Sequence, residues 1–216
     1  MPKLFKILFF FSLILTFTGC SHVYYGAMEK VGVHKRDILV DRVEAARDSQ
    51  QETKEQFVSA LERFNSVINF KGGELEDKYH ELKKELERSE DQVDDVRDRV
   101  DAVEDVAEAL FAEWKTELNQ YTNAKLKQKS AAQLKQTKTH YAKLIGAMKK
   151  AESKIDPVLN PLRDQVLFLK HNLNARAVAS LQTELTKIET DVSRLIRDME
   201  MAMKEADSFI QTLKAE

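Results

Sequence analysis

The sequence predicts an all-α fold, an elongated antiparallel helical bundle or coiled coil of three long helices. Its 216 residues are 32% charged and include only 6 glycines and 3 prolines, so few positions interrupt a helix. Apolar residues recur at alternating spacings of three and four over long stretches, which is the heptad pattern of packed helices. Both observations are more typical of a long helical body than of a globular enzyme.

Helix-breaking residues divide the chain into the three predicted helices. Gly72 and Gly73 close the first, and Pro157 with Pro161 opens the third, because glycine is frequent just after a helix and proline in a first turn. The predicted helices cover residues 27–70, 74–155 and 158–214. They form one predicted domain, residues 27–216, in which the turns make neighbouring helices antiparallel.

The apolar seams differ in strength between the three predicted helices. The second has the longest seam: Leu75, Tyr79, Leu82, Leu86, Ser89, Val93, Val96, Val100, Val103, Ala107, Leu110 and Trp114. Its phase shifts at Leu118 and Tyr121, which we interpret as a stutter where the packing partner changes. The third has a similar seam: Val178, Leu181, Leu185, Ile188, Val192, Leu195, Met199, Ala202, Ala206, Phe209 and Leu213. The first is weaker, because polar Gln50 and Thr53 interrupt it.

The N-terminal stretch predicts a secretory leader that ends just before the only cysteine of the chain. Lys3 and Lys6 precede an almost unbroken apolar run over residues 7–17, which is the order of a signal peptide. The run is shorter than the ~20 apolar residues of a membrane-spanning helix. We therefore expect a signal peptide over residues 1–19.

The residues around Cys20 resemble the processing site of bacterial lipoprotein precursors, in which the cysteine is lipidated and becomes the new N-terminus. The resemblance implies a lipidated tether at residues 20–26 and lasting attachment to a membrane, because several acyl chains together anchor a protein stably. Ser21 stands where an aspartate tends to retain such proteins at the inner membrane, which implies the periplasmic face of the outer membrane. An uncleaved transmembrane anchor is the alternative.

Charge is distributed unevenly along the second predicted helix. Residues 87–105 hold nine acids and three arginines, whereas residues 125–154 hold nine lysines and one glutamate. The candidate interaction surface consists of eight of these lysines: Lys125, Lys127, Lys129, Lys135, Lys138, Lys143, Lys149 and Lys150. A solvated helix face explains such a run as well. As a functional surface, it would contact anionic lipid headgroups, an envelope polymer or protein, or the acidic stretch of a second copy. No aromatic residues alternate with the lysines for base stacking, so we expect no nucleic-acid partner.

The sequence lacks the motifs of common catalytic and metal sites. Its 5 histidines are scattered, and it contains no Glu-x-x-His pair, no His-Glu-x-x-His zinc motif, no phosphate-binding glycine loop and no nucleophile elbow. We therefore expect no enzyme activity, no cofactor and no metal site. Trp114 is interpreted either as a packed residue at the stutter or as an anchor for a partner.

Two segments are richer in distinctive residues than packing requires. Residues 24–43 read YYGAMEKVGVHKRDILVDRV, and residues 170–181 read KHNLNARAVASL. Together with the leader, they resemble the bacterial family known only as domain of unknown function 2959, over most of the chain. The resemblance implies an envelope lipoprotein with a helical coiled-coil body, and it supplies no activity or catalytic residue.

These observations lead to the expectation of a membrane-anchored periplasmic lipoprotein that acts as a non-enzymatic structural or protein-interaction scaffold of the cell envelope. One alternative is a helical carrier or enzyme-accessory lipoprotein that holds a small ligand between its helices. A carrier needs a wide cavity lined by convergent polar groups, and no such cluster is evident in the sequence. Another alternative is a membrane-remodelling dimer, and a homo-oligomer is compatible with the exposed charges.

Overall fold

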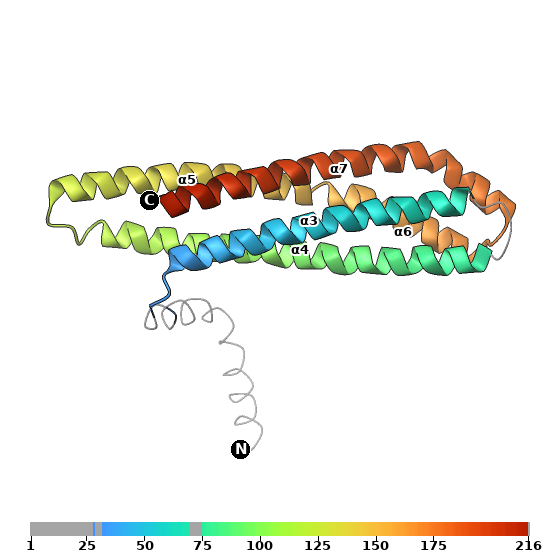
Figure 1. Ribbon diagram of the computed structural model, residues 1–216, viewed down its shortest axis with the longest axis horizontal. Helices are drawn as coiled ribbons and strands as arrows, with labels where there is room; N and C mark the ends of the chain where they lie inside the picture. The colour runs from blue at the N-terminus through green and yellow to red at the C-terminus, as the bar shows by residue number, and fades with distance from the viewer. Residues whose placement is uncertain (1–27, 29–31, 70–74, 216) are drawn as a thin grey trace, which may run out of the picture.

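The computed structural model describes residues 28, 32–69 and 75–215 (Figure 1). Its helices are α3 Lys35–Ile68, α4 Leu75–Glu117, α5 Ala124–Glu152, α6 Ile155–His171 and α7 Ala175–Ala215. No β-strand occurs in these residues, and the predicted all-α class is confirmed. The first predicted helix corresponds to α3.

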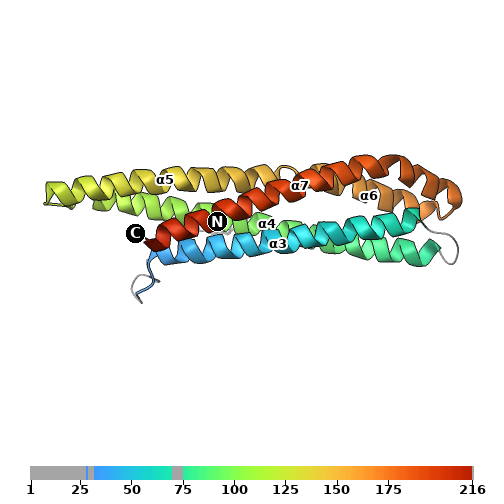
Figure 2. The same cartoon turned by 45° about the horizontal axis from the view of Figure 1, so that its top comes forward.

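The helices form an elongated antiparallel bundle (Figures 1 and 2). α3 runs away from the N-terminal side, α4 returns, α5 and α6 run out again end to end, and α7 returns toward the C-terminus. α3 packs against α4 and α7, whereas α5 and α6 together occupy the remaining side between α4 and α7. Four antiparallel segments therefore enclose the core in the middle of the bundle.

The prediction of one continuous helix over residues 74–155 is wrong, because the chain reverses direction at residues 118–123. Asn123 caps α5, since its side-chain oxygen accepts hydrogen bonds from two backbone N–H groups at 3.0 and 3.1 Å. The shift in phase at Leu118 and Tyr121 therefore marks a hairpin turn and not a stutter. As a result, α5 lies back along α4 instead of extending it.

The prediction of one helix over residues 158–214 is also wrong, because the chain reverses at residues 172–174. Asn174 begins α7, and its side-chain oxygen accepts two backbone N–H groups at 3.0 and 3.1 Å. Pro157 marks no reversal. It lies in the first turn of α6, where a missing N–H leaves no helical bond unmade, and α5 meets α6 at residues 153–154 without a change of direction (Figure 1).

The predicted apolar seams form the core of this bundle. The buried members in α4 are Tyr79, Leu82, Leu86, Ser89, Val93, Val96, Val100, Val103, Ala107 and Leu110. The buried members in α7 are Leu181, Ile188, Val192, Leu195, Met199, Ala202, Ala206, Phe209 and Leu213. Full burial of a large apolar side chain stabilises the fold by about 1.5–3 kcal/mol. The heptad period thus identified the inward faces of both helices correctly.

A polar layer interrupts the core where the seam of the first predicted helix is weak. This polar layer consists of the buried Ser49, Gln50 and Thr53 on α3 with the half-buried Gln92 and Asp95 on α4. The Ser49 hydroxyl donates to the Asp95 carboxylate at 2.9 Å. The Thr53 hydroxyl donates to the Ser49 backbone carbonyl of its own helix at 2.8 Å, and the backbone carbonyl of Gln92 lies 3.3 Å away. Gln50 is buried, and its amide has no hydrogen-bond partner among the described residues. Since an unpaired buried polar group costs about 1–3 kcal/mol, the layer lowers stability relative to an apolar seam.

Candidate interaction surface on the lysine hairpin

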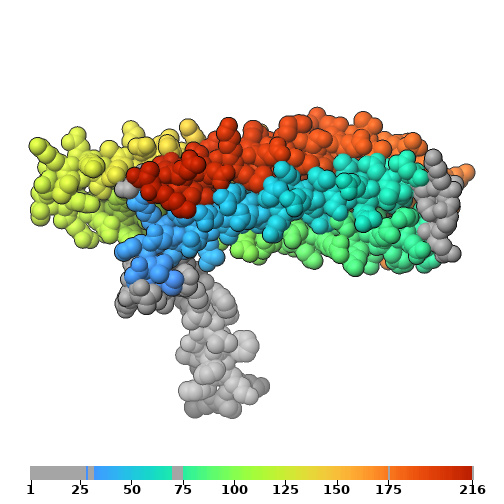
Figure 3. Space-filling model, viewed as in Figure 1, coloured from blue at the N-terminus to red at the C-terminus, as the bar shows by residue number. Residues whose placement is uncertain are grey.

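The antiparallel pair formed by the end of α4 and the start of α5 carries most of the predicted lysine surface. We call residues 111–143 the lysine hairpin. It projects beyond both the first turn of α3 and the C-terminal end of α7 (Figures 1 and 3). Its two helices are therefore more exposed here than in the middle of the bundle.

Aromatic side chains attach the lysine hairpin to the bundle. The ring of Tyr141 on α5 meets the ring of Phe111 on α4 edge-on, with centroids 5.3 Å apart, and lies 6.2 Å from Phe209 on α7. Burial, with smaller contributions from the nearby carboxylates of Glu104 and Glu108, raises the pKa of Tyr141 to about 12. Tyr141 is thus a neutral packing residue at physiological pH.

Trp114 and Ser130 link the two helices of the hairpin directly. The indole Nε1 of Trp114 donates to the Ser130 hydroxyl oxygen at 2.8 Å, and Ser130 is buried. The structure therefore supports the packed-residue interpretation of Trp114, with the hairpin turn in place of the stutter.

Substitution of Trp114 by phenylalanine is expected to lower the free energy of unfolding by about 1–2 kcal/mol, because the buried Ser130 hydroxyl loses its indole partner. Urea unfolding followed by circular dichroism measures the change. A double-mutant cycle with Ser130→Ala provides the control, since Ser130→Ala should cost less in the Trp114→Phe background than in the native chain. Equal costs in both backgrounds would show that the hydrogen bond contributes nothing.

The structure divides the eight predicted lysines into paired and unpaired groups, although all eight are exposed. Lys149 donates to Glu104 across α5 and α4 at 2.6 Å, and this hydrogen bond raises the pKa of Lys149. Lys150 donates to Asp198 of α7 at 2.8 Å. Lys138 lies over the ring of Phe111, with 5.2 Å between Nζ and the centroid. Five form no ion pair with any described residue: Lys125, Lys127, Lys129, Lys135 and Lys143.

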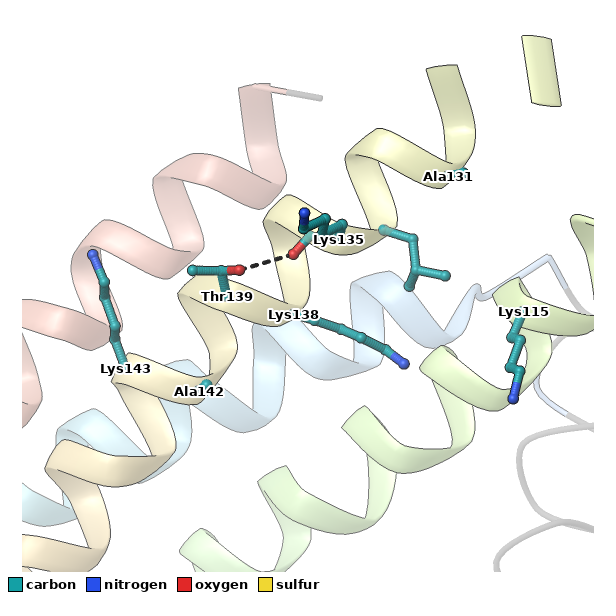
Figure 4. A pocket seen from close by; sticks show the side chains of 8 residues that line it. Lys115, Ala131, Lys135, Lys138, Thr139, Ala142 and Lys143 are labelled. Carbon is teal, nitrogen blue, oxygen red and sulfur yellow. Dashed lines mark hydrogen bonds between the residues drawn. The ribbon is translucent and has the colours of Figure 1, made fainter. Parts of the chain in front are cut away.

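An open groove of about 790 Å³ runs along the outer side of the hairpin (Figure 4). It is lined by Lys115, Ala131, Leu134, Lys135, Lys138, Thr139, Ala142 and Lys143. Lys138 points across the groove toward α4, where Lys115 lies, and the Thr139 hydroxyl donates to the Lys135 carbonyl at 3.0 Å. The groove therefore combines a small apolar floor with ammonium groups from two helices.

Lys115 is absent from the predicted lysine surface, because in a single helix over residues 74–155 it would lie outside the lysine-rich run. The sequence does contain a signal for the chain reversal that brings Lys115 to the groove: the apolar seam ends after Trp114, and polar residues of the turn follow. Once α5 is folded back, Lys115 lies at the same groove as Lys135 and Lys138.

The acidic stretch at residues 87–105 does not form a separate end of an extended rod. Because α5 and α6 lie along α4, several of its acids pair within the bundle. Glu90 accepts from Arg163 of α6 at 2.7 Å, and Glu104 accepts from Lys149. The lysines nearest the hairpin turn are beyond the reach of these acids.

Other predicted features lie partly outside the described residues. Cys20, the leader at residues 1–19, the tether at 20–26 and the Gly72-Gly73 pair all fall there. Among the residues that are described, no cluster of three or more His, Cys, Asp or Glu side chains is placed to hold a metal ion. None of the described helices combines the length and apolar character needed to cross a bilayer.

Comparison with known proteins assigns the chain to a family. No curated protein matches the chain. The family described as protein of unknown function DUF2959 matches residues 24–213, which include both segments that carried the resemblance. The match extends from the residues before α3 almost to the end of α7. The chain therefore belongs to the DUF2959 family.

Proposed function

We propose that the protein is a membrane-anchored lipoprotein of the cell envelope that acts as a non-enzymatic structural or interaction scaffold on the periplasmic face of the outer membrane. One observation carries the proposal: a long bundle with a filled core presents a projecting hairpin whose lysines are exposed and mostly unpaired. Exposed charges contribute little to folding, so a concentration of them is better suited to association than to stability.

The core favours a scaffold over the alternative of a ligand carrier. Buried side chains of all the helices form one continuous apolar cluster along the bundle. Three grooves on the described part of the chain open to solvent, and the largest of the three, at Lys135 and Lys138, lies on the outside of the hairpin. A carrier would instead surround most of its ligand, with a few convergent polar groups to orient it.

The proposed anchor is Cys20, and its support comes from the sequence. The order of basic residues, apolar run and cysteine fits a lipoprotein precursor. Several acyl chains on one residue hold a protein at a membrane far more firmly than one chain does. The helical body then lies at the membrane surface, and none of its described helices crosses the bilayer.

Cys20→Ala tests this proposal in cells. The substitution should abolish acyl labelling and move the chain from the membrane fraction to the soluble fraction, because it removes the site of every acyl chain. Ser21→Ala is the matched control and should leave the chain acylated and membrane-bound. Full retention of the Cys20→Ala variant in membranes would contradict the lipid anchor.

Photo-crosslinking from exposed positions on α6 and α7 tests the scaffold role. A scaffold that acts at the membrane should give defined adducts from the anchored chain, and these should disappear in the Cys20→Ala variant although its helix content is unchanged. Adducts that persist without the anchor would show that the interaction does not depend on membrane attachment, against the proposal.

A further inference from the structure

The lysine hairpin lies at the end of the bundle where α3 begins. Lys35, the first residue of α3, pairs with Glu113 on α4 at 3.0 Å between Nζ and Oε1. The hydrogen bond of Trp114 places Ser130 of α5 at the same level. At 1.5 Å per residue along α5, Lys125 lies about 8 Å from Ser130 toward the hairpin tip. The groove lysines of α5 lie less than about 20 Å from Ser130 in the opposite direction. Figure 3 shows the hairpin and the start of α3 at the same end of the molecule.

The chain between this end of the bundle and Cys20 is short. Met28 and Val33 pack against the core, so the helical body already begins at Met28. Seven residues lie between Cys20 and Met28, and the eight Cα–Cα steps that join them span at most about 30 Å when fully extended. An anchor at Cys20 therefore keeps the hairpin end of the bundle close to the membrane surface. This step rests on the function proposed above.

The tip of the hairpin exposes apolar side chains among its lysines. Leu126 is 53% exposed between Lys125 and Lys127, and Tyr121 in the turn is 40% exposed. Segments that lie in a membrane interface combine the same groups, with apolar and tyrosine side chains at the headgroup boundary and lysines beside the phosphates. The combination at one tip, more than either exposed residue alone, indicates contact with a lipid surface.

The charge of the hairpin is only partly offset by acids. Residues 111–143 contain seven lysines and two acids, Glu113 and Glu117. On α4, Glu113 pairs with Lys35 and Glu104 pairs with Lys149, whereas the exposed Glu108, near Tyr141, forms no ion pair with a described residue. An anionic surface attracts each nearby lysine by about 1 kcal/mol, which is about fivefold in binding.

We infer that the lysine hairpin binds the anionic phospholipid headgroups of the membrane that holds the Cys20 anchor. Tyr121 and Leu126 enter the headgroup boundary, and the ammonium groups of Lys115 and the unpaired α5 lysines contact phosphates. The anchor attaches the chain, and the hairpin orients the bundle with this end against the bilayer. Attachment therefore depends on Cys20, and orientation depends on the residues of the hairpin.

Amine labelling of the anchored full-length chain tests this inference. The lipidated protein is reconstituted into phosphatidylcholine vesicles with or without phosphatidylglycerol, and labelling of each lysine is quantified by mass spectrometry. The hairpin lysines should react about fivefold more slowly when phosphatidylglycerol is present, and high salt should abolish the difference. Lys84, Lys170 and Lys187, which are exposed toward the opposite end, should react equally in both vesicles.

Matched charge reversals provide the second arm of the experiment. The test variant combines Lys125→Glu, Lys127→Glu and Lys129→Glu, and the control variant combines Lys84→Glu, Lys170→Glu and Lys187→Glu. The test variant should stay folded, because all three lysines are exposed and acidic residues are favourable in the first turn of a helix, which holds Lys125 and Lys127 and has no acid in α5. In the test variant Lys115 and Lys135 should lose their protection by phosphatidylglycerol, and in the control variant they should keep it.

The outcomes separate this inference from the proposed anchor. Flotation with phosphatidylcholine vesicles depends on the acyl chains, so failure to float would count against the proposed function. Equal labelling of the hairpin in both vesicle types would overturn the inference while leaving the anchor intact. The inference would also be overturned if protection of the hairpin lysines increased with the amount of protein per vesicle in both vesicle types. That result would favour contact between the hairpin and the acidic stretch of a second copy.

Discussion

Phe209→Ala is expected to lower the free energy of unfolding by about 3–5 kcal/mol. Phe209 is 1% exposed on α7, and its ring lies beside Tyr141, which in turn meets Phe111. Removing the ring leaves a cavity where α4, α5 and α7 meet at the base of the lysine hairpin, and the surrounding side chains relax into it only in part. Urea unfolding followed by circular dichroism measures the loss.

Phe168→Ala is the matched control for this cavity. Phe168 has the same side chain but is 42% exposed on α6, so its removal should change the free energy of unfolding by less than about 1 kcal/mol. Similar losses in the two variants would show that Phe209 does not hold the core together as its burial indicates. Hydrogen exchange would further show whether Phe209→Ala loosens α5 in particular.

Val100→Asp is expected to destabilise the chain by about 3–5 kcal/mol at neutral pH, because it places an unpaired carboxylate in the centre of the α4 seam. Val100 is fully buried, and burial raises the pKa of a carboxyl group above the ~3.9 of an unfolded chain. The folded variant then holds its proton to higher pH than the unfolded variant does. Its stability therefore falls as the pH rises from about 4 through the raised pKa.

The pH dependence of unfolding checks the sign of this effect. The difference between the native chain and the Val100→Asp variant should be smaller at pH 5 than at pH 7 in urea titrations. Val58→Asp, at a 39% exposed position on α3, should cost little at either pH. A deficit for Val100→Asp that grows on acidification would contradict a buried, uncompensated charge.

The inward faces of the helices were predictable, and the reversals of the chain were not. The seam of α4 follows from a period that any apolar partner satisfies, so Val93 and Val100 could be assigned without knowing which helix covers them. The turn at residues 118–123 contains neither glycine nor proline, so the Asn123 cap is its main local signal, and the Trp114–Ser130 hydrogen bond across the hairpin joins residues 16 positions apart. Pro157, which resembles a boundary signal, is compatible with the first turn of a helix that continues in the same direction.

The candidate site was predictable in its charge and not in its pairing. That all eight lysines are exposed follows from their positions off the α5 seam. Which of them are neutralised depends on helices that are distant in sequence, as the pairing of Lys150 with Asp198 shows. Lys115 joins the groove only because α5 folds back beside it. A single sequence contains no direct record of such contacts.

The polar layer between α3 and α4 fixes how these two helices are aligned along their axes. The apolar pattern of a seam repeats every heptad. Two helices that pack through such seams alone can therefore shift along each other by about 10 Å and still bury valine against leucine. A slide of that size would separate the Ser49 hydroxyl from the Asp95 carboxylate, which are in contact in only one alignment. Because Lys35 begins the same helix, this alignment also fixes how far the hairpin tip extends past the point where the N-terminal chain leaves the bundle. The reach of the tip is thus determined near the middle of the bundle, several helical turns from the surface that uses it.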